Sequence, residues 1–211
     1  MSFPVAKKCF LAFRSLTLAA LLAAAPFAAH ADVDSDYQAG MSAFRGGDLF
    51  SAMEPLRRAA DAGHPHAQAV LAYILDLGEY NEEAYRYYKL SAEQDFPDGI
   101  YGLASMTISG DGVEQDIEKG LELLKRAAAL GHAYSWNALA DALLNGMLAP
   151  PTEQPYAEEI LTKSAESGYI RSIDALSMAY SKGMLGIAPD PERAELWTKK
   201  AGDAKAAAAN Q

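Results

Sequence analysis

Small and apolar residues recur along the chain with the period of amphipathic helices. Gly99, Leu103, Ala104 and Thr107 lie at positions i, i+4, i+5 and i+8, which places them on one face of a helix. The sequence Gly110-Asp111-Gly112-Val113 follows, and its glycines supply the backbone freedom that a tight turn requires. We therefore expect a helix that packs one face against a neighbour and ends before this turn.

A second amphipathic run begins after the turn. Asp116 is a suitable N-cap, because its short side chain carries an oxygen that can accept from the first free N–H groups. Gly131 fits the left-handed position that follows the C-terminus of a helix. The expected buried stripe between them is Leu121, Leu124, Ala127 and Ala128. The unit is therefore helix, turn, helix, turn.

The end of this unit is repeated along the chain. Five short phrases of small residues resemble one another, and the second small residue of each serves as an anchor at positions 60, 92, 128, 165 and 202. The anchors are 32, 36, 37 and 37 residues apart. A fixed period of this size is typical of a stacked repeat array, in which each unit buries little alone and neighbours share a core. We expect five helix pairs without a sheet, and a function in holding another protein rather than in catalysis.

The first 31 residues follow a different pattern. Lys7, Lys8 and Arg14 precede an apolar run, Leu16 to Ala29, whose 14 residues are fewer than the about 20 that a membrane span needs. Ala29-His30-Ala31 then offers small residues at the two positions that a signal peptidase reads. We expect residues 1–31 to be a signal peptide cleaved after Ala31; an uncleaved anchor is the alternative. Residues 32–205 would form the repeat domain and residues 206–211 a polar C-terminal tail.

The charge balance limits the partners of the exported chain. Without the three basic residues of the signal peptide, the chain has 15 basic and 28 acidic residues, which gives a formal net charge of −13. Phosphates would be repelled, which argues against nucleic acid and anionic membranes as partners. A basic protein would be attracted, although the charge can also serve only to keep a secreted protein soluble. The one cysteine, Cys9, leaves with the signal peptide. We expect a periplasmic protein, with an extracellular location left open.

The repeat resembles the Sel-one-like repeat family, a branch of the tetratricopeptide-like α-solenoids. The unit around Gly110 and Gly112 carries the family phrase in register, and the second repeat is the weakest match. The fourth repeat has Pro150, Pro151 and Pro155 where the glycine-valine turn belongs. The fifth repeat matches at Leu176, Tyr180, Gly183, Gly186, Ile187, Asp190, Arg193, Ala194, Trp197, Lys200 and Ala201. The resemblance covers about residues 34–205 and implies an all-α, right-handed α/α superhelix of about five helix-turn-helix repeats.

Few residues point to chemistry. His64 and His66 flank Pro65 and could begin a metal site, but such a site needs a third and a fourth ligand, and none is visible nearby. His132 follows Gly131 at a helix end, where a partly positive ring would favour the helix dipole. Acidic pairs are most simply helix surface. We expect no catalytic residues, no metal and no cofactor.

The resemblance also places the binding surface. In tetratricopeptide-like arrays the first helix of each pair lines the concave face, and the positions beside the buried leucine and glycine point into it. Aromatic anchors near one end of the array, together with aspartates along the groove, would suit protein recognition. The register gives Tyr37, Met41, Phe44, Arg45, Ala69, Tyr73, Asp76, Tyr101, Ser105, Asn137, Asp141, Asp174 and Met178.

These observations favour a non-enzymatic protein–protein interaction module of the bacterial cell envelope, acting as a periplasmic scaffold or regulator through its concave groove. Known relatives also include toxin-immunity proteins, so an immunity protein that neutralises a toxin is an alternative. A secreted hydrolase that uses surface carboxylates or the His64 and His66 turn is an alternative of another class.

Overall fold

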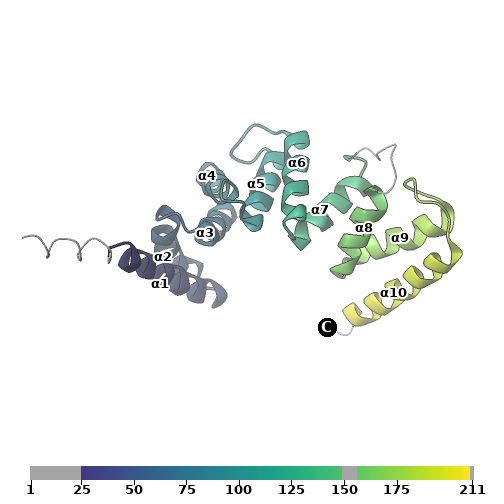
Figure 1. The fold of residues 1–211 in the computed structure, drawn as a ribbon, viewed down its shortest axis with the longest axis horizontal. Coiled ribbons are helices and arrows are strands. Elements are labelled where there is room, and N and C mark those ends of the chain that lie inside the picture. The colour runs from purple at the N-terminus through teal and green to yellow at the C-terminus, as the bar shows by residue number, and fades with distance from the viewer. Residues whose placement is uncertain (1–24, 149–155, 210–211) are drawn as a thin grey trace, which may run out of the picture.

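The chain forms an array of helix pairs that follow one another in sequence order (Figure 1). The computed structural model describes residues 25–148 and 156–209, with side chains from residue 32 onward. Every regular element in these ranges is a helix. The helices are α1 (Ala25–Arg45), α2 (Leu49–Asp61), α3 (Pro65–Leu77), α4 (Asn81–Ala92), α5 (Pro97–Ser109), α6 (Ile117–Ala129), α7 (Ala133–Leu144), α8 (Tyr156–Glu166), α9 (Ile170–Lys182) and α10 (Pro191–Ala209).

Each helix packs on the next one along the chain, and α3 also contacts α5, the first helix of the following pair. The expectation of an all-helical solenoid with five helix pairs is confirmed. Capping residues set the boundaries as the sequence predicts: Asp116 Oδ1 accepts from the N–H of Lys119 at 3.0 Å, at the start of α6. Gly110 and Gly131 both have a positive φ, 85° and 88°, just after α5 and α6.

The repeated small residues are the places where helices approach most closely. The first residue of each anchor pair is buried in all five repeats, and the second is buried in the first four. The pairs are Ala59 and Ala60, Ser91 and Ala92, Ala127 and Ala128, Ser164 and Ala165, and Ala201 and Gly202. Position 202 differs from the other four: Gly202 is exposed, and a Cβ there would meet no atom within 4 Å.

Two glycines of α5 bring this helix against α4. A Cβ at Gly99 would lie 2.2 Å from Oγ of Ser91, and one at Gly102 would lie 2.1 Å from Cε1 of Tyr88. Contacts this short do not occur between real side chains, so only glycine allows α4 and α5 to pack at this distance. Gly102 therefore gives the Tyr88 ring its place between the two helices.

The core divides into two overlapping clusters. One joins α1 to α6 and includes Leu56, Leu71 and Tyr87. The other joins α5 to α10 and includes Leu139 and Leu176. Side chains of α5 and α6 belong to both clusters, so this pair links the two halves of the array.

Some expectations fall at the edges of what the structure describes. The basic start and most of the apolar run of the expected signal peptide lie outside the described residues, as do Pro150, Pro151 and Pro155. Helix α1 begins at Ala25 and runs through the expected cleavage site at Ala31. Cleavage there remains a prediction. No helix in the described ranges is long and apolar enough to cross a membrane.

Candidate functional site

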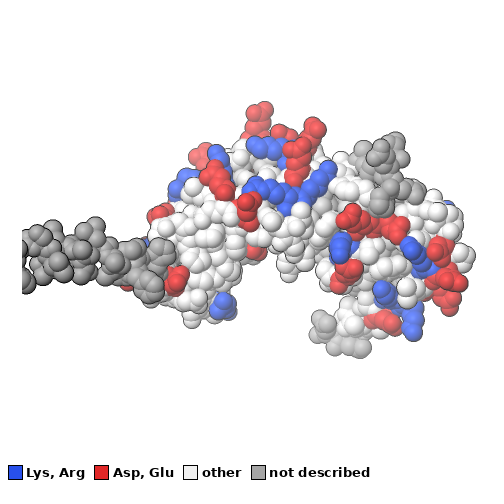
Figure 2. Space-filling model, viewed as in Figure 1, with Lys and Arg blue, Asp and Glu red and all other residues white. Residues whose placement is uncertain are grey.

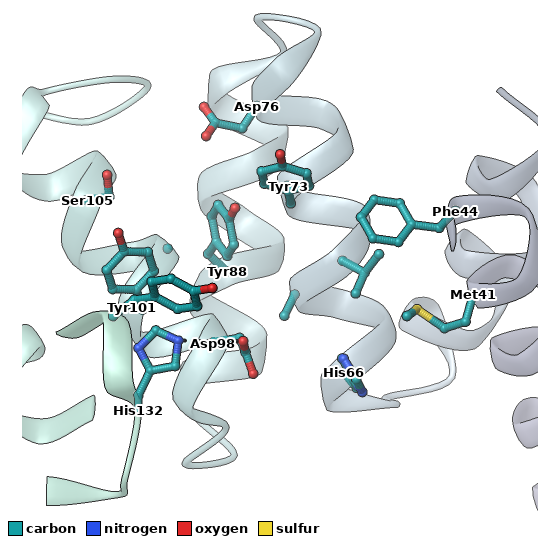
Figure 3. A pocket seen from close by; sticks show the side chains of 14 residues that line it. Met41, Phe44, His66, Tyr73, Asp76, Tyr88, Asp98, Tyr101, Ser105 and His132 are labelled. Carbon is teal, nitrogen blue, oxygen red and sulfur yellow. Dashed lines mark ion pairs between the residues drawn. The ribbon is translucent and has the colours of Figure 1, made fainter. Parts of the chain in front are cut away.

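The concave face of the first three helix pairs contains a groove with a volume of about 460 Å³ (Figure 3). The first helices of the pairs supply most of its wall, and α4 and the start of α7 complete it. The lining residues are Met41, Phe44, His66, Ala69, Val70, Tyr73, Asp76, Tyr88, Asp98, Tyr101, Gly102, Ser105, His132 and Tyr134. We call the surface that these residues form the groove.

Aromatic rings dominate the groove. Tyr88 is 6% exposed and lies deep, whereas Tyr73 and Tyr134 are 45% and 68% exposed at the rim. The edge of Phe44 meets the ring of Tyr73 with centroids 6.1 Å apart. Burial raises the pKa of Tyr88 and of Tyr101, which are therefore neutral hydroxyl groups at neutral pH. The surface offers flat apolar faces with hydrogen-bonding hydroxyls.

Two carboxylates lie in the groove, and their environments differ. Oδ1 of Asp98 lies 3.6 Å from Nε2 of His132, and the interaction with this ring lowers the pKa of Asp98. Asp76 is half-buried, and its carboxylate has no hydrogen-bond or ion-pair partner among the described residues. Burial, with a smaller effect from the charge of Asp111, raises the pKa of Asp76. Asp76 is thus the carboxylate whose charge is not compensated.

His64 and His66 contact Tyr37 and the start of α3. The hydroxyl of Tyr37 is 2.6 Å from Nδ1 of His66, and the Tyr37 ring stacks on His64 with centroids 4.2 Å apart. Nδ1 of His64 accepts from the N–H of Ala67 at the start of α3. Burial lowers the pKa of His66, which favours its neutral form. Among the described residues, no group of three or more histidines, cysteines and acids is placed to hold a metal ion.

His132 follows Gly131 after the end of α6, as expected, and is also the N-cap residue of α7. Its Nδ1 lies 2.9 Å from Oγ of Ser135, and its ring lies 4.8 Å from that of Tyr101. His132 therefore connects the start of α7 to the groove. Its contact with the helix dipole remains a prediction.

Comparison with known proteins places this geometry in a family. The Sel1 repeat model matches residues 65–96, 97–132 and 172–205, which correspond to α3 with α4, α5 with α6, and α9 with α10. The chain is a Sel1-repeat protein. Two of the three matched segments contain most of the groove.

Solved structures agree with this assignment. A protective antigen present in uropathogenic Escherichia coli strains, which displays an SLR fold, is 27% identical with a TM-score of 0.69 over 84% of this chain and 40% of its own. A Sel1 repeat protein from Oxalobacter formigenes is 32% identical, with a TM-score of 0.64 over 72% of this chain and 45% of its own. A putative Sel1 repeat protein from Klebsiella pneumoniae, 21% identical with a TM-score of 0.51, shows the fold alone. This Sel1-repeat protein spans less than half the length of the first two.

The structure brings half of the twelve site residues expected from the sequence together in the groove, along with Ala69. These are Met41, Phe44, Tyr73, Asp76, Tyr101 and Ser105. Two others lie on α1 beside it: Tyr37 packs on His64, and Arg45 is exposed in the last turn. That the six residues bind a partner remains a prediction.

The four expected residues on α7 and α9 do not line the groove. Asn137 accepts from Ser164 and Ser167, and Asp141 accepts from the Tyr169 hydroxyl at 2.8 Å and pairs with Arg171 at 2.5 Å. Asp174 pairs with Lys205 at 2.8 Å, and Met178 is 48% exposed. Asp141 and Asp174 thus each pair with a residue about 30 positions further along the chain.

Sequence reasoning missed several residues of the groove. His66, Asp98 and Tyr134 each lie three residues before Ala69, Tyr101 and Asn137, one turn earlier on the same helix face. Extending the expected stripe by one turn would have found them. The signal for Tyr88 is weaker, because it comes from a second helix and reaches the groove only where Gly102 leaves space.

Proposed function

We propose that this chain is a non-enzymatic interaction module that is exported to the bacterial cell envelope and binds another protein in its groove, as a periplasmic scaffold or regulator. Sel1 repeats generally mediate protein–protein interactions, and this supports the general class. The observation that carries the proposal is the aromatic groove itself, with Tyr73 and Tyr134 exposed at its rim. Aromatic side chains in such positions supply a large share of the free energy of binding at protein interfaces.

Export is supported by the basic start, the short apolar run and Ala29-His30-Ala31. N-terminal sequencing of the protein from the envelope fraction should find Asp32 as the first residue. A full-length chain that begins at Met1 and stays in the cytosol would contradict the proposed location.

Site-specific photo-cross-linking in living cells tests the proposed surface. A photoreactive phenylalanine at Ser105, which is exposed in the groove, should yield one dominant cross-linked protein. The same residue at Phe50, which is 88% exposed on α2 outside the groove, should not. Equal cross-linking from both positions would argue against the groove as the binding site.

A double variant links this cross-link to the aromatic side chains. Tyr73→Ala with Tyr101→Ala removes two anchors, each expected to contribute about 1–4 kcal/mol to binding. The Ser105 cross-link should disappear in this variant, and Phe50→Ala serves as the control for loss of an exposed aromatic ring. Tyr37 is left unchanged, because its stacking on His64 gives it a role in packing. Circular dichroism checks that the double variant stays helical.

A further inference from the structure

One carboxylate of the groove lacks a cation of the kind that several other carboxylates of the array have. Asp76 lies at one end of the groove, with Tyr73 and Tyr88 between it and the end that holds Asp98 and His132 (Figure 3). Asp98 already pairs with His132. Asp76 is half-buried and unpaired among the described residues, and a carboxylate in such a position is unfavourable unless a ligand compensates it.

Several other aspartates of the array pair with a cation from another helix. Asp36 and Asp174 contact Arg58 and Lys205 within their own helix pairs, and Asp95 and Asp141 contact Arg126 and Arg171 of the following pair. Figure 2 shows the result on one face, where red and blue side chains lie side by side over α4 to α6 and α8 to α10. The carboxylate of Asp76 is a half-buried one that lines the groove and has no such cation among the described residues.

The array contains a complete version of the same arrangement near its C-terminal end. The Tyr180 hydroxyl donates to Oε1 of Glu158 at 2.6 Å, and Nη1 of Arg193 lies 2.7 Å from the same oxygen. The Arg193 guanidinium lies 5.3 Å from the centroid of the Tyr180 ring. One arginine thus contacts both a carboxylate and the face of a tyrosine.

A second version lies in the first half of the array. Arg57 donates to Glu83 and lies 5.8 Å from the centroid of the Tyr87 ring. Arg86 lies over the same ring at 4.1 Å. The groove has the tyrosine and the carboxylate of this arrangement in Tyr88 and Asp76, but no arginine among its lining residues.

We propose that the groove binds a peptide segment of a partner protein through one arginine side chain, whose guanidinium lies against the tyrosine rings and pairs with Asp76. This inference rests on the proposed function and names the chemistry of the partner. Arginine suits the site better than lysine, because its planar guanidinium stacks on aromatic rings, is weakly hydrated and pairs with a carboxylate through two N–H groups.

The shape of the groove favours a peptide over a small free cation. Its volume of about 460 Å³ exceeds what one guanidinium fills, and Met41, Phe44 and Val70 offer apolar contacts beside the rings. Tyr73 and Tyr134 are exposed at the rim, so the groove is open to a chain that continues beyond it. Flanking apolar residues of the peptide would cover this surface.

The test is a selection of peptides from a random 12-residue display library with the wild-type protein. Selected peptides should be enriched in arginine, and their binding is then measured by fluorescence anisotropy. Asp76→Asn should weaken binding about tenfold, because one partner of a desolvated charge pair is lost. Replacing the arginine of the peptide by citrulline, which has the same shape and no charge, should weaken binding equally.

Control measurements separate the proposed arginine site from the proposed binding of a protein in the groove. Asp203→Asn removes one negative charge from an exposed position of α10 and should leave binding unchanged. The melting temperature of Asp76→Asn should equal or exceed that of the wild type, which shows that loss of binding is not loss of folding. The citrulline peptide should bind wild type and Asp76→Asn with the same affinity.

Three outcomes would overturn the inference, and they can be told apart. Peptides without enriched arginine, or equal binding by Asp76→Asn, would refute the arginine site and leave the groove standing if Tyr73→Ala with Tyr101→Ala still abolishes binding. Binding unaffected by the tyrosine variant would refute the groove as well. N-acetyl-arginine amide binding as tightly as the peptide would identify a small cation as the ligand instead.

Discussion

The two halves of the concave face use the same helix positions for opposite purposes. On α3 and α5 these positions carry Tyr73 and Tyr101, and they line an aromatic groove. On α7 the corresponding positions carry Asn137 and Asp141; Asn137 accepts from Ser164 of α8, in the same helix pair, and Asp141 accepts from Tyr169 at the start of the next pair. The same backbone geometry therefore forms an open groove or an internal connection, depending on whether a following helix supplies a partner for the side chain.

The two halves also differ in how their polar side chains connect the helices. In the second half, Arg171 contacts both Asp141 and Asn145 and so connects α9 to α7. In the first half, the carboxylate of Asp76 has no hydrogen-bond or ion-pair partner among the described residues. Residues kept for binding are often less favourable for stability than their alternatives. We expect substitutions in the two halves to have opposite effects on stability and on binding.

Among the substitutions that test this comparison, Gly102→Ala is expected to have the largest effect on stability and binding. Its new Cβ would meet the ring of buried Tyr88, which must shift and change the shape of the groove. We expect a loss of about 1–3 kcal/mol in the free energy of unfolding, as for other overpacked cores, together with loss of peptide binding. Chemical denaturation followed by circular dichroism measures the first effect, and anisotropy the second.

Gly202→Ala provides the matched control for this change. Gly202 lies inside α10, and a Cβ there meets no atom within 4 Å. The substitution should therefore stabilise the protein by about 0.5–1 kcal/mol through helix propensity alone. If Gly102→Ala behaved in the same way, the close packing of α4 on α5 would be wrong.

An intermediate effect is expected for Asp141→Ala in the second half. The change removes the acceptor for Tyr169 and the ion pair with Arg171, both partly exposed, so the cost should be about 1 kcal/mol. Peptide binding in the groove should not change. Asp76→Asn should give the reverse pattern, with weaker binding and undiminished stability. A loss of binding in Asp141→Ala would show that the site extends along the whole concave face.

The smallest effect is expected in the pH dependence of stability. Burial raises the pKa of Asp76 above its ordinary value of 3.8, so the folded chain binds this proton more tightly than the unfolded chain does. The unfavourable charge of Asp76 is then present at neutral pH and disappears as the pH falls through the raised pKa. The stability advantage of Asp76→Asn should shrink in acid denaturation curves measured from about pH 7 to pH 4.

Asp98→Asn should show the opposite sign. The interaction with the His132 ring lowers the pKa of Asp98. Its contribution to stability is present above the ordinary value of 3.8 and is lost as the pH falls through the lowered pKa. Asp98→Asn should therefore be less stable than the wild type at neutral pH. The same sign for both variants would mean that the two carboxylates have similar environments.

The sequence predicted the helices and their caps, because these depend on local spacing. Asp116 and Gly131 act at the helix ends where they were expected. The second repeat looked weakest by its residues, yet residues 65–96 match the family model. The spacing of the anchors does not show which of them are buried, and Gly202 is exposed while the other four are buried.

The site could be predicted only in part, and the reason is physical. A register on one helix shows which side chains face the concave side, but not which of them are already paired. Arg171 is 30 residues from Asp141, and nothing in a single repeat indicates that they meet. The position of Tyr88 in the groove likewise depends on a residue of another helix, because the missing side chain at Gly102 leaves space for its ring.

The overlap of the two core clusters at α5 and α6 has a consequence for the dynamics of the array. Stability in such arrays is transmitted from neighbour to neighbour, so the terminal pairs open more readily than the middle. Twelve of the fourteen groove residues lie on α1, α3, α4 and α5. Opening of α9 and α10, seen as early exchange of their amide hydrogens, would therefore leave the groove formed, whereas opening of α1 would remove Met41 and Phe44 from it.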